Sequence, residues 1–124
     1  MRRIGLLIAL SVTTPASAQD SVTVTLTNFH FTPAALKFHH GQTYTLRIVN
    51  GSSSGHNFAA PEFFAASTMN AVERAKAPGG KIELSGGEST ELHLTAPARP
   101  GSYKLKCSHF LHSSFGMTGE ITVD

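Results

Sequence analysis

The chain has 124 residues, of which 40% are hydrophobic and 15% are charged, with seven histidines, one cysteine and no tryptophan. This size and composition suit a single globular domain and exclude a multidomain enzyme, a disulfide-stapled miniprotein and a periodic repeat protein. The formal net charge is +2, but Arg2 and Arg3 account for two of the ten basic residues, so the rest of the chain has eight basic and eight acidic residues. A neutral domain of this kind is not expected to bind nucleic acid.

The first 18 residues are typical of a secretory signal peptide. A basic start is followed by an apolar run at residues 4–12 and by the small residues Ala16, Ser17 and Ala18. The apolar run is about half of the ~20 residues that a membrane-spanning helix needs, so an anchor is disfavoured. We expect cleavage before Gln19, export to the periplasm, a mature domain at residues 19–124, and no transmembrane segment in that domain.

From Ser21 onward, apolar residues occupy every second position in several short runs, which is the pattern of half-buried strands. Turn signals such as Asn50-Gly51, Gly86-Gly87 and Pro100-Gly101 separate these runs. Short strands at this spacing predict an all-β fold, either an antiparallel sandwich or a barrel. The runs are Val22, Val24 and Leu26; Tyr44, Leu46 and Ile48; Ile82 and Leu84; Leu92 and Leu94; Tyr103, Leu105 and Cys107; Ile121 and Val123.

Residues 62–77 break the alternation. This segment is rich in alanine and carries Met69, Val72 and Ala75 near helical spacing. It predicts a short helix or folded flap between strands, and Met69 is expected to cover the core. No linker or second domain is expected.

The last quarter of the chain carries the clearest chemistry. Cys107 ends a predicted strand, His112 and Met117 follow in a loop at intervals of five residues, and the chain returns as another strand. A thiolate, an imidazole and a thioether together favour a soft metal ion. A lone cysteine at a strand end is more often a small buried hydrophobe, but this cysteine belongs to a chain with signs of export and has no possible intramolecular disulfide partner.

A second histidine ligand must come from elsewhere, and His56 is the candidate. It lies in the segment 50–58, just after a predicted strand. Gly116 and Gly119 are expected to let the backbone bend closely around a buried ion.

These motifs resemble those of the cupredoxins, the small blue-copper family that includes plastocyanin, azurin and rusticyanin. The resemblance covers the mature chain and implies a Greek-key β-sandwich that binds one copper ion through His56, Cys107 and His112, with Met117 as a weak axial ligand. The matching segments are Phe31-Thr32-Pro33, the Gly41 turn, His56-Asn57, Pro100-Gly101-Ser102-Tyr103 and Gly116-Met117-Thr118-Gly119-Glu120-Ile121.

The resemblance also implies two residues that support the ligands without binding the metal. In the family, an asparagine after the first histidine commonly bonds a serine or threonine after the cysteine, and this chain has Asn57 and Ser108 at those positions. The alternative is a local turn at Asn57 with a solvated Ser108. Gly55 is a further accessory candidate, because the azurin histidine also follows a glycine whose carbonyl lies near the metal.

His109 departs from the family pattern. It lies two residues after the cysteine, where the family has no usual ligand, so a partly exposed loop residue is expected, with a supporting or alternative copper contact as the other interpretation. The Cys-x4-His-x4-Met spacing resembles rusticyanin and the type 1 site of multicopper oxidases. Those oxidases carry histidines on both sides of the cysteine, where this chain has Lys106 and Ser108, so no trinuclear centre is expected.

No constellation for hydrolysis or group transfer is present in the sequence, so we do not expect an enzyme. The favoured function is one-electron transfer by a periplasmic copper protein, with redox proteins as partners. The alternative is copper handling, meaning tolerance, buffering or delivery, with a copper transporter or chaperone as partner; a metal-free structural module is the weakest hypothesis. A monomer is expected.

Overall fold

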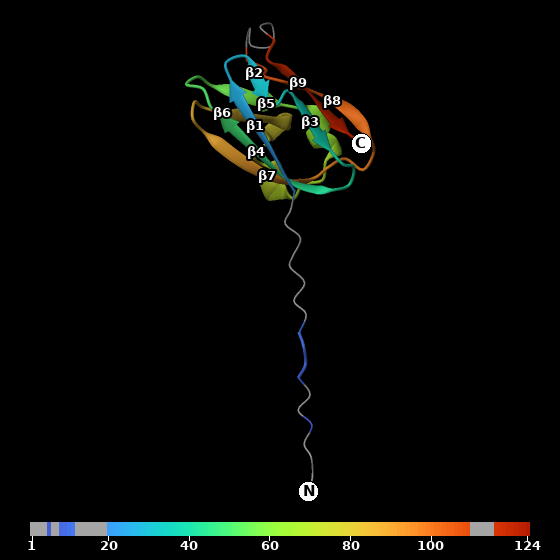
Figure 1. Cartoon of the computed structure of the whole chain (residues 1–124). Coiled ribbons are helices and arrows are strands. Elements are labelled where there is room, and N and C mark those ends of the chain that lie inside the picture. The colour runs from blue at the N-terminus through green and yellow to red at the C-terminus, as the bar shows by residue number, and fades with distance from the viewer. Residues whose placement is uncertain (1–4, 6–7, 12–19, 110–115) are drawn as a thin grey trace.

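The computed structural model describes residues 5, 8–11, 20–109 and 116–124. Its strands form a sandwich of two sheets (Figure 1). The elements in chain order are β1 (Asp20–Thr27), β2 (His30–Thr32), β3 (Ala35–Phe38), β4 (Thr43–Asn50), β5 (His56–Ala59), α1 (Pro61–Ala66), α2 (Ala71–Arg74), the 3-10 turn η1 (Pro78–Gly80), β6 (Lys81–Leu84), β7 (Ser89–Thr95), β8 (Gly101–Lys106) and β9 (Thr118–Val123).

The two sheets are mixed. One has the strand order β2-β1-β4-β7 and the other β3-β9-β8-β5-β6. The predicted β-sandwich is confirmed, but the expected antiparallel pairing is wrong for two pairs, since β1 runs parallel to β4 and β3 runs parallel to β9. Alternation of apolar residues identifies the buried face of a strand but carries no information on the direction of its neighbour.

The core lies between the sheets and contains most of the residues that the alternation predicted, together with phenylalanines that it did not predict. Every second residue of β4 is buried, and the apolar residues of β6, β7 and β9 follow the same rule. Phe58 is fully buried and packs edge-on against Phe31, with ring centroids 6.1 Å apart. Such a core stabilises the sandwich by removing apolar surface from water.

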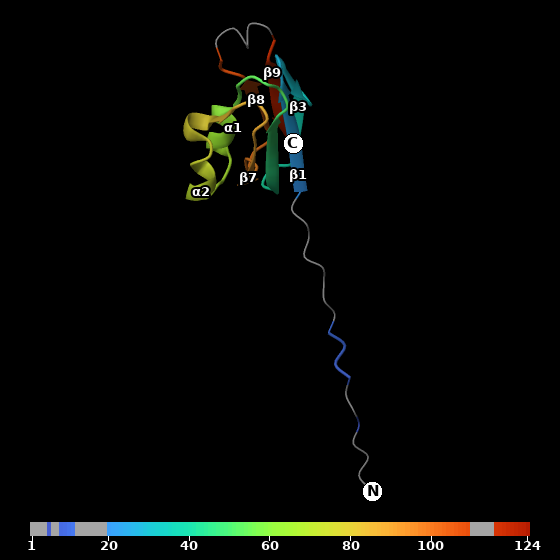
Figure 2. The ribbon, with the colours of Figure 1, turned by 90° about the vertical axis from the view of Figure 1, so that its left-hand side faces the viewer.

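The predicted helical insert is confirmed as two short helices, which lie together at one side of the strands (Figure 2). α1 packs against β8, and α2 packs against β7. The expected apolar spacing does not mark the buried face, however. Val72 is 71% exposed, Met69 is only partly buried, and the residue that α2 buries is Glu73.

The Glu73 carboxylate connects the insert to the sandwich. Its Oε2 accepts hydrogen bonds from the backbone N–H of His93, at 3.0 Å, and from Lys76 Nζ, at 3.1 Å. The backbone N–H of His93 lowers the pKa of Glu73; burial opposes this shift, and Lys76 reinforces it. The folded state therefore favours the ionised form of the Glu73 carboxyl group.

We predict that Glu73→Gln lowers the free energy of unfolding by about 1 kcal/mol at pH 7. Because the folded-state pKa is lower than the unfolded-state value of about 4.3, the stabilisation is complete above that value and disappears as the pH falls through the folded-state pKa. Urea unfolding at pH 7 and at pH 3 measures this difference. Glu62→Gln, at an exposed position of α1, is the control, and an equal loss for Glu73→Gln at both pH values would contradict the prediction.

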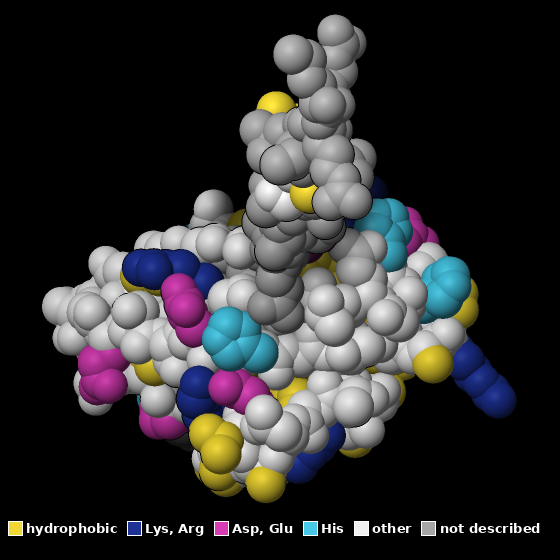
Figure 3. All heavy atoms as spheres, turned by 90° about the horizontal axis from the view of Figure 1, so that it is seen from below, with side chains coloured by type: hydrophobic (Ala, Val, Ile, Leu, Met, Phe, Trp, Pro, Cys, Tyr) yellow, Lys and Arg dark blue, Asp and Glu magenta, His cyan; other side chains and the backbone are white. Residues whose placement is uncertain are grey.

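The lower face of the sandwich carries charges of both signs. Figure 3 shows acidic, basic and histidine side chains interspersed over this face. His39 Nδ1 bonds Asp124 Oδ1 at 2.6 Å, and His40 Nδ1 bonds the Asp124 carbonyl oxygen at 2.7 Å. In the described part of the chain, no helix is long and apolar enough to span a bilayer.

Candidate metal centre

Three of the four predicted ligand positions lie in the described residues, and all three are fully buried. His56 begins β5, Cys107 follows β8, and Met117 precedes β9. These positions meet at one end of the sandwich, where β8 ends and β9 begins (top of Figure 1). The strand registers explain this convergence, because β5 and β8 are antiparallel neighbours, and so are β8 and β9.

The Cys107 sulfur is held by backbone groups. The backbone N–H of Asn57 donates a hydrogen bond to Cys107 Sγ at 3.4 Å. The backbone N–H of Cys107 in turn donates to the Met117 carbonyl at 3.1 Å, which continues the pairing of β8 and β9 by one step. An N–H that points at sulfur stabilises negative charge there, and the thiolate is the form of cysteine that binds metals.

The protonation of the His56 ring follows from its neighbours. Nε2 lies 3.2 Å from Asn28 Oδ1 and 3.4 Å from Ser54 Oγ. An amide oxygen can only accept, so Nε2 carries the proton and donates to Asn28. The lone pair for coordination is then on Nδ1, and a second hydrogen bond of this kind is what orients metal-binding histidines in general.

Asn57 and Ser108 are joined by two hydrogen bonds. Asn57 Nδ2 donates to Ser108 Oγ at 2.7 Å, and the Ser108 backbone N–H donates to Asn57 Oδ1 at 2.8 Å. The pair thus ties the start of β5 to the segment after β8 across 51 positions of sequence. The contact is the one that the sequence led us to expect, and its role at a metal stays a prediction.

Asn50 shapes the loop that leads to His56, a role that the sequence did not reveal. Its side chain is fully buried, and Nδ2 donates to the carbonyls of Ser54, at 2.8 Å, and Leu84, at 3.0 Å. Its Oδ1 accepts from the backbone N–H of Ser52 at 3.0 Å. In the sequence, Asn50 was recognisable only as half of an Asn-Gly turn signal, and Asn28 carried no signal at all, since it lies 28 positions from the ring it bonds.

His109 lies beside His56 and is bound by a residue that we did not predict, Glu83. His109 Nε2 lies 2.5 Å from Glu83 Oε1, and the His109 and His56 rings are stacked with centroids 6.4 Å apart. A Cβ atom built on Gly55 would be 3.5 Å from His109 Cε1, so the imidazole packs over that glycine. The His109 side chain is 30% exposed.

The remaining residues that we predicted at or near the site are His112, Gly116 and Gly119. His112 lies outside the described residues. Within the described residues, no three His, Cys, Asp or Glu side chains are close enough together to hold a metal ion. Gly116 has φ of +87°, which favours glycine. We expected Gly119 to let the backbone bend around the ion, but the structure shows another reason for a glycine there. A Cβ atom at this position would lie 2.5 Å from the Ala34 carbonyl oxygen, so the backbone at Ala34 leaves no room for a side chain.

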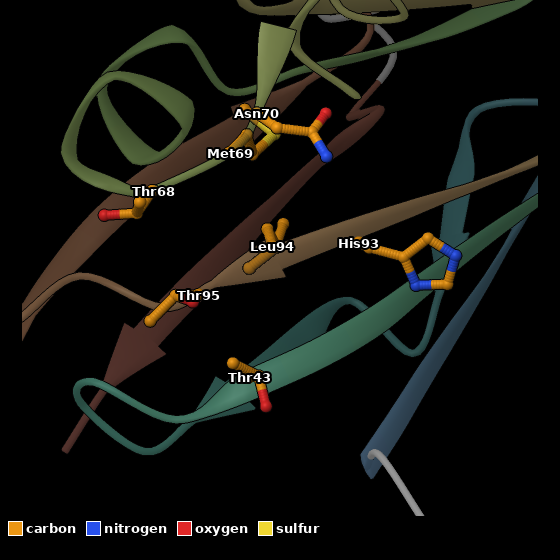
Figure 4. Close-up of a pocket in the computed structure, with 7 residues that line it drawn as sticks. All are labelled: Thr43, Thr68, Met69, Asn70, His93, Leu94 and Thr95. Atoms are coloured by element: carbon orange, nitrogen blue, oxygen red, sulfur yellow. The ribbon is translucent and has the colours of Figure 1, made fainter. Parts of the chain in front are cut away.

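A shallow pocket of about 220 Å³ lies elsewhere, at the opposite end of β4 (Figure 4). It is lined by residues that include Met69 and His93, but the His93 ring points away from Met69, and His93 Nδ1 lies 3.1 Å from Thr45 Oγ1. The eight residues of β4 separate the pocket from the His56 loop by about 23 Å. The two histidine-bearing regions therefore lie at opposite ends of β4.

The chain was compared with known proteins. A family model described as a cupredoxin-like domain matches residues 3–123. Among solved structures, a sodium-dithionite-reduced auracyanin from Roseiflexus castenholzii is 22% identical with a TM-score of 0.64, covering 87% of this chain and 99% of that one. Auracyanin B is 24% identical with a TM-score of 0.61, covering 93% and 95%.

A third structure, auracyanin A, is described as a "blue" copper protein from Chloroflexus aurantiacus; it is 21% identical with a TM-score of 0.61, covering 86% of this chain and all of that one. A search of curated proteins found no relative. The family match spans nearly the whole chain, and the structural matches agree with the observed sandwich. The chain belongs to the cupredoxin-like domain family.

Proposed function

We propose that this protein is a periplasmic copper protein that carries single electrons between redox partners. One copper ion would be held by His56, Cys107 and His112, with Met117 as a weak axial ligand. The observation that carries the proposal is the buried Cys107 sulfur, which accepts a hydrogen bond from the backbone N–H that follows the His56 position.

The donor set fits copper. A histidine nitrogen, a thiolate and a thioether are ligands that copper accepts in both of its oxidation states. Bound copper would supply a centre that cycles between Cu(II) and Cu(I). The chain's own residues would keep the ligands in place through this cycle, because Asn28 orients the His56 ring and Asn57 fixes both the sulfur and the segment that follows it.

The signal-like residues 1–18 support export to the periplasm, and the family likeness supports electron transfer rather than catalysis. The residues around His112 are apolar in the sequence, namely Phe110, Leu111 and Phe115. They would suit the surface at which a redox partner docks, since family members pass electrons near this histidine. The proposed protein is a monomer that binds one copper ion per chain.

The test is to load the exported protein with copper and to cycle it electrochemically in the presence of a Cu(I) chelator. An electron carrier should bind one copper per chain and give a reversible one-electron couple, and the chelator should take up no copper over the time of the redox cycles. Rapid transfer of copper to the chelator after reduction would contradict electron transfer and would instead support copper handling. A second assay mixes the protein with a small c-type cytochrome and measures electron exchange by absorbance.

A further inference from the structure

We propose that Glu83 is a positioning residue of this centre, which holds His109 as a cover over Gly55 and His56 and secures Asn57 at the same time. This inference rests on the proposed copper site. It concerns a residue of β6 that no ligand motif contains.

The carboxylate of Glu83 lies between two segments of the site. Glu83 is directly opposite Asn57 in the register of β5 and β6. Its Oε2 accepts from Asn57 Nδ2 at 3.1 Å, and its Oε1 lies 2.5 Å from His109 Nε2. One side chain therefore connects the β5 position after His56 with the segment after Cys107, in parallel with the bonds between Asn57 and Ser108.

Both partners of Glu83 can donate, which suits a carboxylate, because each of its oxygens accepts. Asn57 Nδ2 is an amide nitrogen with two hydrogens, and an imidazole nitrogen facing an ionised carboxylate must carry its proton. A glutamine at position 83 has one accepting oxygen and one donating NH2, so it could bond both partners only if His109 Nε2 gave up its proton and became the acceptor. Replacement by glutamine should thus either break one of the two hydrogen bonds or force the His109 ring into its other tautomer.

The His109 ring that Glu83 holds acts as a cover. It lies against Gly55 and stacks beside the ring of His56, which is fully buried. His109 Nε2 faces the Glu83 carboxylate, and the His109 ring centroid lies 6.4 Å from that of His56. His109 is therefore placed to restrict access to His56 and to oppose release of the metal, rather than to coordinate it.

The experiment compares Glu83→Gln, Glu83→Ala, His109→Ala and the double variant Glu83→Ala/His109→Ala in the copper-loaded protein. The rate at which reduced protein gives copper to an excess of a Cu(I) chelator is the readout. Each single variant should release copper about three- to tenfold faster than the wild type. Because the two residues act as one unit, the double variant should match Glu83→Ala rather than multiply the two effects.

The matched control is Glu91→Gln, which changes a glutamate on the other sheet that pairs with Arg47; its side chain is 50% exposed, against 60% for Glu83. Release at the wild-type rate is expected for this variant. Wild-type rates in both Glu83 variants, or multiplied effects in the double variant, would overturn the inference. A tenfold or larger loss of equilibrium copper affinity in His109→Ala would also overturn it, because His109 would then be a ligand.

The contact can be tested without copper as well. In the metal-free protein, NMR should show altered Asn57 side-chain amide resonances in Glu83→Gln and unaltered ones in Glu91→Gln, and unaltered resonances in both would count against the bridge. A wild-type protein without a copper band that depends on Cys107 would refute the proposed function. A normal band with unchanged release rates in the Glu83 variants would refute only the role of Glu83.

Discussion

Cys107→Ser should abolish the intense visible band of the copper-loaded protein and most of its copper affinity. The band is expected from charge transfer between the thiolate and Cu(II), and a serine hydroxyl, which stays protonated near neutral pH, cannot replace a thiolate as a ligand. Serine is close to cysteine in size, so the fully buried site should keep its packing. Absorption spectra and copper titration of both proteins measure the change.

Two controls make this result interpretable. Unfolding in urea should show that Cys107→Ser retains the cooperative transition of the wild type, since the fold does not depend on the metal ligand alone. Met117→Leu, which keeps a buried apolar side chain at the expected axial position, should retain the band with altered energy. Colour that survives Cys107→Ser, or a colourless Cu(II) complex of the wild type, would contradict the assigned ligand.

The fold could be predicted where burial alternates along a strand. β4 shows this best, because one face lies on the core and the other is at least partly exposed. β5 could not be predicted as a strand, since all four of its residues are buried and a period of two is absent. β2 was missed for a different reason: it has three residues, which is too short for periodicity to be recognised.

The candidate site could be predicted where its residues are linked by short sequence spacing. Cys107 and Met117 lie ten residues apart and belong to one motif, so the sequence was sufficient to propose them as ligands. Asn28 and Glu83 lie on other strands or turns and reach the site only through tertiary contacts. Glu83 would have been found if the register of β5 against β6 had been known, since it lies directly opposite Asn57.

Several of the hydrogen bonds that join the two ligand-bearing segments are made by one residue, Asn57. Asn57 bonds the Cys107 sulfur through its backbone, and Ser108 and Glu83 through its side chain. The backbone bond does not depend on the side chain, so substitution separates the two contributions. Loss of the side chain should loosen the segment after Cys107 while the direct N–H donor to sulfur remains.

Asn57→Ala should therefore leave the protein folded and lower its copper affinity about 10- to 100-fold, the range found when residues behind metal ligands are removed. The substitution removes both bonds to Ser108 and the bond to Glu83. Competition with a copper chelator measures the affinity, and the reduction potential and visible band report on the site itself. Ser108→Ala is the matched control, because it removes only the bond to Oγ and keeps the one from the Ser108 backbone N–H, so it should have a smaller effect. If affinity, band and potential are all unchanged in Asn57→Ala, the side chain of Asn57 does not support the metal, and the two hydrogen bonds to Ser108 serve the fold alone.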